Sequence, residues 1–301
     1  MSNILLIFLC LGIGVLLRYF KRMPDQAHVT LNAFVIYIAI PALALYHIPK
    51  IQLSRDLIFP IATGWIIFAA SWLFFGLFGH FGGWSRKLTG ALILTAGLGN
   101  TAFVGFPMMQ ALYGEEGLKT AIILDQPGSF FIVSTLGVVV ASIYSGVSTN
   151  ARTLAKKVIF FPPFIGFSIA LLLNAFSVRL PDVADNIVSQ LSQSITPLAL
   201  VSVGLQLKIE LRNSHWGFLG LGLAFKLIMA PLLIYFIYGT LFNQHGNQFN
   251  VCVLEAAMAP MVTAVIVASA FGLKPRFSSL MISVGIPLSL ITVLLWNLLL
   301  T

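Results

Sequence analysis

Residues 97–107 read Gly-Leu-Gly-Asn-Thr-Ala-Phe-Val-Gly-Phe-Pro, in the middle of a long apolar run at about 88–112. The three glycines weaken a helix, and the proline removes a backbone donor and clashes with the carbonyl four residues earlier. Backbone groups freed in this way inside a membrane must be buried in protein or line a wet cavity. The stretch therefore predicts a helix that is broken deep within its apolar run.

The rest of the chain has the composition of an integral membrane protein. Of its 301 residues, 58% are apolar and only 9% are charged, whereas a soluble domain carries about 25% charged residues. The net charge is +8, but the basic residues are scattered singly, which does not favour nucleic-acid binding. No hydrolase or nucleotide-binding motif is present, and Cys10 and Cys252 form no metal-binding pattern. We expect neither an enzyme nor a cofactor.

Ten apolar runs are long enough to span a membrane, since a helix needs about 20 residues to cross the hydrocarbon core. The expected fold is all-α, with ten transmembrane helices joined by short connections. The runs are at about 3–20, 29–48, 57–80, 88–112, 118–145, 157–177, 186–207, 215–240, 247–271 and 277–300.

The basic residues are distributed unequally between the loops on the two sides. Twelve Lys and Arg residues lie in the odd-numbered loops and four in the even-numbered loops, and neither terminus has any. Because basic loops stay on the cytoplasmic side, both termini are expected to be extracytoplasmic. The expected location is the cytoplasmic (inner) membrane.

The two halves of the chain resemble each other at an offset of about 156–160 residues. Pro41 in the second run corresponds to Pro197 in the seventh, and Pro127 in the fifth corresponds to Pro287 in the tenth. Each half holds five spans, so the repeats must be inserted in opposite senses, as in many secondary transporters. The expected domains are a first repeat at 1–145, a cytoplasmic linker at 146–156 and a second repeat at 157–301.

A second break is expected in the ninth run, where residues 255–263 read Glu-Ala-Ala-Met-Ala-Pro-Met-Val-Thr. The functional interpretation is a pair of broken helices that cross near the midplane. Their half-helix N-termini would face an anion, and their unwound carbonyls would meet a cation. The alternative is a pair of kinks that serve packing alone. The expected crossover and hinge residues are Gly97, Gly99, Gly105, Pro107 and Pro260.

Three ionisable residues lie inside the spans: Asp125, Lys226 and Glu255. Each would cost about 2.5–3.5 kcal/mol at the centre of a lipid-facing helix. They must therefore face a cavity, pair with one another or lose their charge. With Gln126, which follows Asp125, they are the candidates for ion coupling. A structural ion pair between Lys226 and one of the two acids is the alternative.

Residues 99–107, followed by Ala-Leu-Tyr-Gly at 111–114, resemble the fourth-helix signature of the auxin efflux carrier family. The stretches 31–43 and 196–204 resemble the second and seventh helices of the same family. That family includes plant auxin exporters and bacterial carriers assigned to malonate, malate and related acids. The resemblance implies two inverted five-helix repeats, with helices 1, 2, 6 and 7 as a scaffold. Helices 3–5 and 8–10 would form a moving core with crossovers in helices 4 and 9.

The resemblance also implies which residues contact the substrate. Asn100 and Thr101 would lie at the first crossover and Pro260 at the second, while Asn32 and Pro41 would line the scaffold side. Met258 and Met261, on either side of Pro260, are candidates as well. Pro260 stands one residue later than in the plant pattern, and the long plant loop is absent. A compact prokaryotic member is therefore expected rather than an auxin carrier.

Residues 255–258 also resemble a segment of the distantly related bile acid:sodium symporters, whose glutamate binds sodium. This similarity implies Na+ at Glu255 as one alternative for the coupling ion, with H+ as the other.

The expected function is secondary active transport of a small organic, carboxylate-type anion by an elevator or rocking motion. A cation/proton antiporter is an alternative, although it would favour adjacent carboxylates where this chain has Asp125-Gln126. A channel or receptor without coupled transport is another. The expected partners are the anion and membrane lipid, and a homodimer through the scaffold helices is left open.

Overall fold

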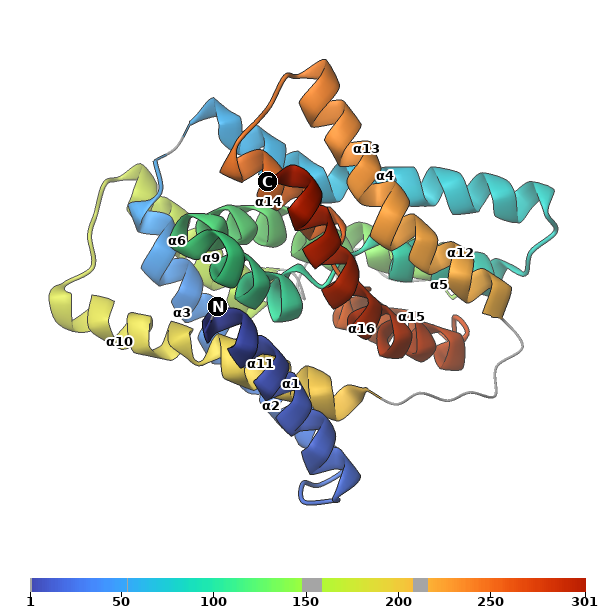
Figure 1. The fold of residues 1–301 in the computed structure, drawn as a ribbon, viewed down its shortest axis with the longest axis horizontal. Coiled ribbons are helices and arrows are strands. Elements are labelled where there is room, and N and C mark those ends of the chain that lie inside the picture. Colours follow the sequence, from blue (N-terminus) through green and yellow to red (C-terminus); the bar gives the residue numbers. More distant parts are fainter. Residues whose placement is uncertain (1, 53, 148–158, 208–215) are drawn as a thin grey trace. The chain divides into compact units, whose positions relative to one another are not determined.

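The computed structural model describes residues 2–52, 54–147, 159–207 and 216–301. Within these ranges the regular elements are all helices, apart from one isolated β-bridge between Gly99 and Pro260 (Figure 1). The predicted all-α class is confirmed for this part of the chain. Most of the expected linker 146–156 lies outside the described residues, as do five of the basic loop residues: Arg152, Lys156, Lys157, Lys208 and Arg212.

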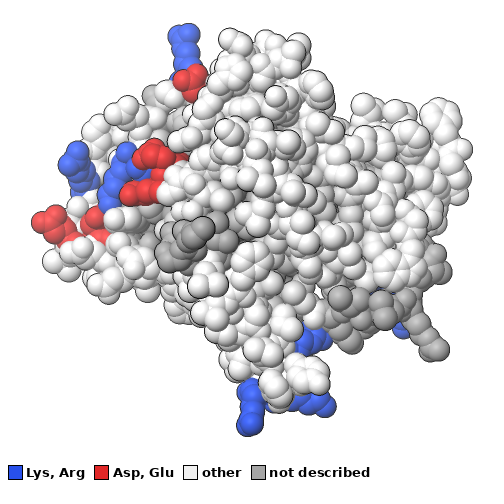
Figure 2. Space-filling view, in the orientation of Figure 1, with Lys and Arg blue, Asp and Glu red and all other residues white. Residues whose placement is uncertain are grey.

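In the part of the chain that the structure describes, six helical segments are long and apolar enough to cross a membrane. Two shorter apolar helices accompany them, at Leu5–Tyr19 and Pro162–Ala175. On the face drawn in Figure 2, charged side chains gather in a few small clusters and most of the surface has none, as contact with lipid requires. The protein is therefore a multi-pass membrane protein, and the ten-span inverted repeat stays a prediction. The six segments are Ala27–Lys50, Arg55–Phe81, Thr101–Ser145, Asp182–Gln206, Trp216–Leu241 and Pro275–Leu300.

The chain folds into two compact units, each of which draws on both halves of the sequence. Unit 1 comprises Met1–Arg55, Ala102–Ile122 and Lys156–Leu207. Unit 2 comprises Asp56–Thr101, Ile123–Ala155 and Lys208–Thr301.

In unit 1, α1 (Ser2–Tyr19) packs against α11 (Ile195–Gln206), and the two helices lie side by side in Figure 1. Gly14 and Gly204 allow the close approach, because a Cβ at Gly14 would lie 2.9 Å from the Cα of Gly204. The other helices of this unit are α2 (Ala27–Phe34), α3 (Ile40–His47), most of α6 (Phe106–Leu124), α9 (Pro162–Ala175) and α10 (Asp182–Gln193).

Unit 2 holds the long helices α4 (Ile58–Phe81) and α16 (Pro275–Leu300) together with several shorter ones. The shorter helices are α5 (Arg86–Gly97), α7 (Val138–Ser145), α12 (Trp216–Ala224), α13 (Ala230–Ile234), α14 (Asn247–Ala256) and α15 (Val262–Ala270). Short π-helical turns connect some of them: η5 (Asp125–Phe130), η6 (Val133–Gly137) and η8 (Tyr235–Leu241).

Prolines account for several irregular turns within the helices. A proline has no N–H, so the regular bond to the carbonyl four residues back is lost and the helix widens locally. Three π-helical turns end two residues before a proline: η1 (Val35–Ala39) before Pro41, η4 (Thr101–Gly105) before Pro107 and η7 (Phe225–Met229) before Pro231.

The helices of the structure differ from the expected apolar runs at two places. The seventh apolar run, expected as one helix over 186–207, consists of α10 and α11 with Ser194 between them. Pro197 provides the reason, because it cannot donate to the carbonyl of Gln193. The fourth and fifth runs are joined by α6, which is kinked at Gly114, where φ is 64°. Glycine adopts this left-handed conformation without steric cost.

Candidate functional site at two broken helices

Two helices of unit 2 are interrupted, and their interruptions meet. Helix α5 ends at Gly97, and the backbone at Leu98 is extended. Helix α14 ends at Ala256, and α15 begins only at Val262. Between the breaks, the N–H of Asn100 donates to the carbonyl of Ala259 at 2.7 Å.

A second backbone bond closes this antiparallel pairing. The N–H of Met261 donates to the carbonyl of Leu98 at 3.0 Å, on either side of the bridge between Gly99 and Pro260. Each break therefore supplies hydrogen-bond partners to the other. Backbone groups inside a membrane must find their hydrogen-bond partners within the protein, and this pairing provides them.

Glycines allow the close approach of neighbouring residues around this pairing. A Cβ at Gly99 would lie 3.0 Å from Nζ of Lys226, and one at Gly97 would lie 2.9 Å from Oγ of Ser71. A Cβ at Gly285, in α16, would lie 2.5 Å from Cδ of Pro260. The close contacts around the two breaks thus depend on residues without side chains.

A buried carboxylate lies next to the first break. Asp125, the first residue of η5, accepts a hydrogen bond at Oδ1 from the hydroxyl of Thr101, at 2.5 Å. It accepts another at Oδ2 from Nε2 of Gln126, at 2.8 Å. All three residues are buried. The structure therefore joins three of the predicted site residues into one polar cluster.

Two further charged residues lie at the second break. Lys226, on η7, is buried and donates from Nζ to the carbonyl of Ala256 at 2.9 Å. Glu255 is buried as well, and its two carboxylate oxygens have no hydrogen-bond partner among the described residues. The ion pairs of the described side chains with an N–O distance of up to 4.0 Å do not include Lys226.

The structure divides the remaining predicted residues between the units. Met258 and Met261 are buried at the second break in unit 2. Asn32, Pro41, Gly105 and Pro107 belong to unit 1.

Asn32 and Pro41 have contacts within unit 1. Oδ1 of Asn32 accepts a hydrogen bond from Oγ of Ser202 at 2.6 Å, which links α2 to α11. Pro41 packs closely on α9, because a Cβ at Gly166 would lie 2.8 Å from its Cα. A role of either residue in substrate binding stays a prediction.

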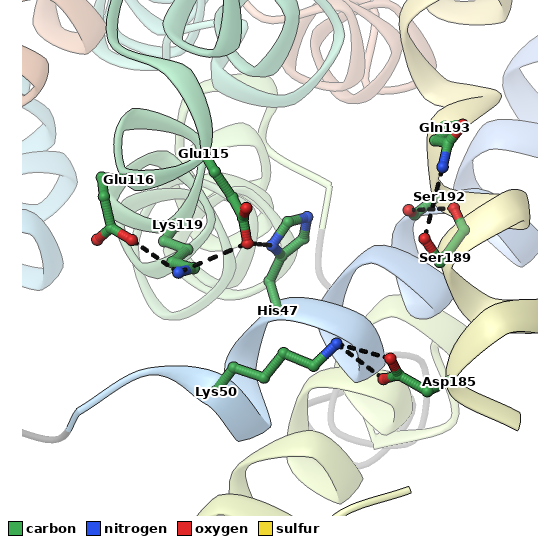
Figure 3. A network of polar contacts seen from close by, with 9 residues as sticks. All are labelled: His47, Lys50, Glu115, Glu116, Lys119, Asp185, Ser189, Ser192 and Gln193. Atoms are coloured by element: carbon green, nitrogen blue, oxygen red, sulfur yellow. Dashed lines mark hydrogen bonds and ion pairs between the residues drawn. The ribbon is translucent and has the colours of Figure 1, made fainter. Parts of the chain in front are cut away.

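Unit 1 also contains a polar cavity that the sequence did not suggest. Its volume is about 340 Å³. Buried His47 lies on its wall, with Nδ1 3.7 Å from Oε1 of Glu115, and Lys119 is 2.7 Å from Oε1 of Glu116 (Figure 3). The cavity is lined by Leu43, Tyr46, His47, Phe106, Gln110, Glu115, Leu118, Ser189, Ser192, Gln193, Ile195 and Thr196.

These cavity residues come from α3, α6, α10 and α11. The only signal in the sequence is the spacing of Glu115, Glu116 and Lys119, which places opposite charges on one helix face. His47 stands at the end of an apolar run, where a histidine is common, and nothing local indicates its distant partner.

No group of three His, Cys, Asp or Glu residues suited to a metal ion occurs in the described part of the chain. The polar chemistry of the two breaks comes from amide, hydroxyl, carboxylate and ammonium groups. Such a set can hold a small polar solute and a proton.

Known proteins resemble this chain over its whole length. A family described as "Membrane transport protein" matches residues 1–297. An uncharacterized transporter of Methanocaldococcus jannaschii is 27% identical over 307 residues, covering 99% of this chain and 97% of that protein. An uncharacterized transporter of Methanothermobacter thermautotrophicus is 28% identical over 298 residues, covering 98% of this chain and 97% of that protein.

A plant protein matches half of the chain. A probable auxin efflux carrier component 5a of Oryza sativa is 30% identical over 153 residues, which are 50% of this chain and 41% of that protein. These relatives are transporters and not enzymes. The chain belongs to the membrane transport protein family, the family of the auxin efflux carriers.

Proposed function

We propose that the protein is a secondary active transporter that moves a small organic anion of the carboxylate type across the cytoplasmic membrane. The observation that carries the proposal is the pairing of two broken helices at Gly99 and Pro260, with buried polar side chains around it. Secondary transporters use interrupted helices of this kind to bind solutes near the bilayer midplane. A pair of breaks that served packing alone would not require six buried polar or charged residues around it: Asn100, Thr101, Asp125, Gln126, Lys226 and Glu255.

The chemistry around the breaks suits a carboxylate. Asn100 and Thr101 follow the end of α5, and Pro260 and Met261 precede the first turn of α15. The first N–H groups of a helix have no intrahelical acceptor, and its N-terminus has positive potential. The amide of Asn100 and the N-terminus of α15 together offer donors to an anion, with Met258 and Met261 as apolar walls and the Thr101 oxygen beside them. Asn32 and Pro41 are proposed as contacts from unit 1.

Coupling to H+ or Na+ would involve the buried charged groups of unit 2. Asp125, with Gln126 and Thr101 as its donors, and Glu255, with Lys226 nearby, are the candidates. A carboxyl group taken out of water gains or loses a proton according to its neighbours. Binding of substrate beside it can therefore be linked to proton binding.

Alternating access requires that one part of the protein move relative to another. The division of the chain into two compact units supports an elevator or rocking motion of this kind. We propose that both termini are extracytoplasmic, as the loop charges indicate. A homodimer through the scaffold helices 1, 2, 6 and 7 is a further proposal.

The test is uptake of radiolabelled mono- and dicarboxylates into proteoliposomes, with imposed pH and Na+ gradients. Asn100→Ala is expected to reduce uptake about tenfold or more, since a hydrogen bond to a charged group contributes about 1.5–3 kcal/mol and 1.4 kcal/mol is a factor of ten. Glu255→Gln is expected to abolish gradient-driven accumulation. Exposed Asn186→Ala and Glu116→Gln are the matched controls.

Wild-type uptake by both Asn100→Ala and Glu255→Gln would contradict the assignment of the site. Flux that never concentrates a carboxylate against its gradient would contradict active transport and favour a channel. Exchange of Na+ for H+ without any carboxylate would favour the antiporter.

A further inference from the structure

The second break holds a positive charge that belongs to the chain itself. Lys226 reaches from η7 to the end of α14, where Nζ contacts the carbonyl of Ala256 at 2.9 Å. The residue is 1% exposed. A buried ammonium is costly unless negatively polarised groups lie nearby to offset its charge.

The contacted carbonyl is the one that the helix leaves open. In the last turn of α14, the carbonyls of Val253, Leu254 and Glu255 accept hydrogen bonds from backbone N–H groups that follow. The carbonyl of Ala256 accepts from Lys226. The ammonium thus lies at the negative end of a half-helix, which is where a cation is favoured.

Glu255 adds an acidic group at the same end. Its carboxylate is buried and has no hydrogen-bond partner among the described residues. Unwound backbone carbonyls and the C-terminal ends of half-helices are the groups that transporters use to coordinate Na+ at broken helices. From its oxygen ligands alone, the end of α14 would suit Na+.

The ammonium changes this fit. Nζ of Lys226 already occupies the open carbonyl, and it lies close enough to Gly99 that a Cβ there would be 3.0 Å away. A Na+ ion beside Glu255 would meet a second positive charge at short range in a medium of low dielectric constant, where repulsion is strong. The residues present therefore do not fit Na+.

We propose that Lys226 is a tethered substitute for a coupling Na+ ion: its ammonium fills the cation position at the end of α14, so the transporter binds no sodium there. This inference rests on the proposed transport function and narrows the choice of its coupling ion to H+. Asp125, which lies in the same unit, remains available for a proton.

The test measures thermal unfolding of the purified protein in detergent, in NaCl and in choline chloride of equal ionic strength. Wild type is expected to unfold at the same temperature in both salts. Lys226→Ala opens the cation position, and Na+ is expected to raise its unfolding temperature by about 2 °C or more through mass action. n-Propylammonium, which resembles the missing side chain, is expected to raise it as well. Both effects should disappear in Lys226→Ala/Glu255→Gln.

Lys226→Gln provides a second variant in case Lys226→Ala does not fold. Its amide can still donate to the carbonyl of Ala256 but has no charge, and the same Na+ effect is expected. A Na+-specific rise in wild type that Glu255→Gln abolishes would overturn the inference. So would Lys226→Gln and Lys226→Ala variants that fold but respond equally to Na+ and choline, because Lys226 would then be a helix cap alone.

These outcomes are independent of transport. The unfolding measurements use only Na+, choline and n-propylammonium, so they test the cation position whether or not a carboxylate is carried. Failure of the proposed function would appear instead as wild-type protein that accumulates no carboxylate in proteoliposomes.

Discussion

Removal of the Thr101 hydroxyl tests how much the hydrogen bonds of the polar cluster at the first break stabilise the folded protein. Thr101→Val keeps the shape of the side chain but deletes the donor that contacts Oδ1 of Asp125 at 2.5 Å. Asp125 would then retain Gln126 as its one side-chain donor among the described residues. A hydrogen bond to a charged group contributes about 1.5–3 kcal/mol, and a buried acceptor left without its donor loses a comparable amount.

The measurement is thermal unfolding of the purified protein, followed by intrinsic fluorescence. A loss of this size corresponds to a fall of roughly 3–10 °C in unfolding temperature for a large domain. Thr95→Val is a matched control, because Thr95 is also buried and its hydroxyl donates only to the carbonyl of Ala91 within the same helix. That carbonyl keeps its regular helical partner, so a change below about 1 kcal/mol is expected.

A double-mutant cycle separates the bond from other effects of the substitution. Combined with Asp125→Ala, Thr101→Val is expected to add much less destabilisation than it causes alone, since the partner is already absent. Additive effects, or a fall no larger than that of Thr95→Val, would refute the reasoning that the Thr101 hydroxyl stabilises the carboxylate.

Three further predictions concern packing and topology. Gly14→Ala is expected to destabilise the protein by about 1–3 kcal/mol through overlap with α11, whereas Gly12→Ala, with no atom within 4 Å of its new Cβ, should be neutral or slightly stabilising in thermal unfolding. Gly285→Ala places a Cβ 2.5 Å from the proline of the second break, so both unfolding temperature and carboxylate uptake should fall, and unchanged values would contradict the contact. In intact cells of a cysteine-free variant, an impermeant thiol reagent should label Thr301→Cys but not Lys87→Cys, and the opposite pattern would reverse the orientation.

The breaks in the helices could be predicted from the sequence because their causes are local. Glycine and proline alter the backbone wherever they stand, so residues 97–107 and Pro260 marked the interruptions without any tertiary information. The hydrogen bonds between the two breaks could not be predicted in the same way. The bond from Asn100 to Ala259 joins positions far apart in the sequence.

For the charged groups, too, the sequence predicted the residues but not their partners. Their cost in a membrane identified Asp125, Lys226 and Glu255 from the sequence alone. The partner of Lys226 is a backbone carbonyl. Every residue has such a carbonyl, so the sequence does not indicate which one is the partner. The cavity beside His47 escaped prediction for a related reason, because its wall is assembled from four helices whose residues carry no common motif.

The pairing of Leu98–Asn100 with Ala259–Met261 has a consequence for how the protein is made. A membrane protein is synthesised from its N-terminus, so the first break exists before the residues that complete it. Until residues 259–261 arrive, the N–H of Asn100 and the carbonyl of Leu98 lack the partners they have in the finished fold. The first half of the chain therefore lacks these two hydrogen bonds until the second half has been inserted.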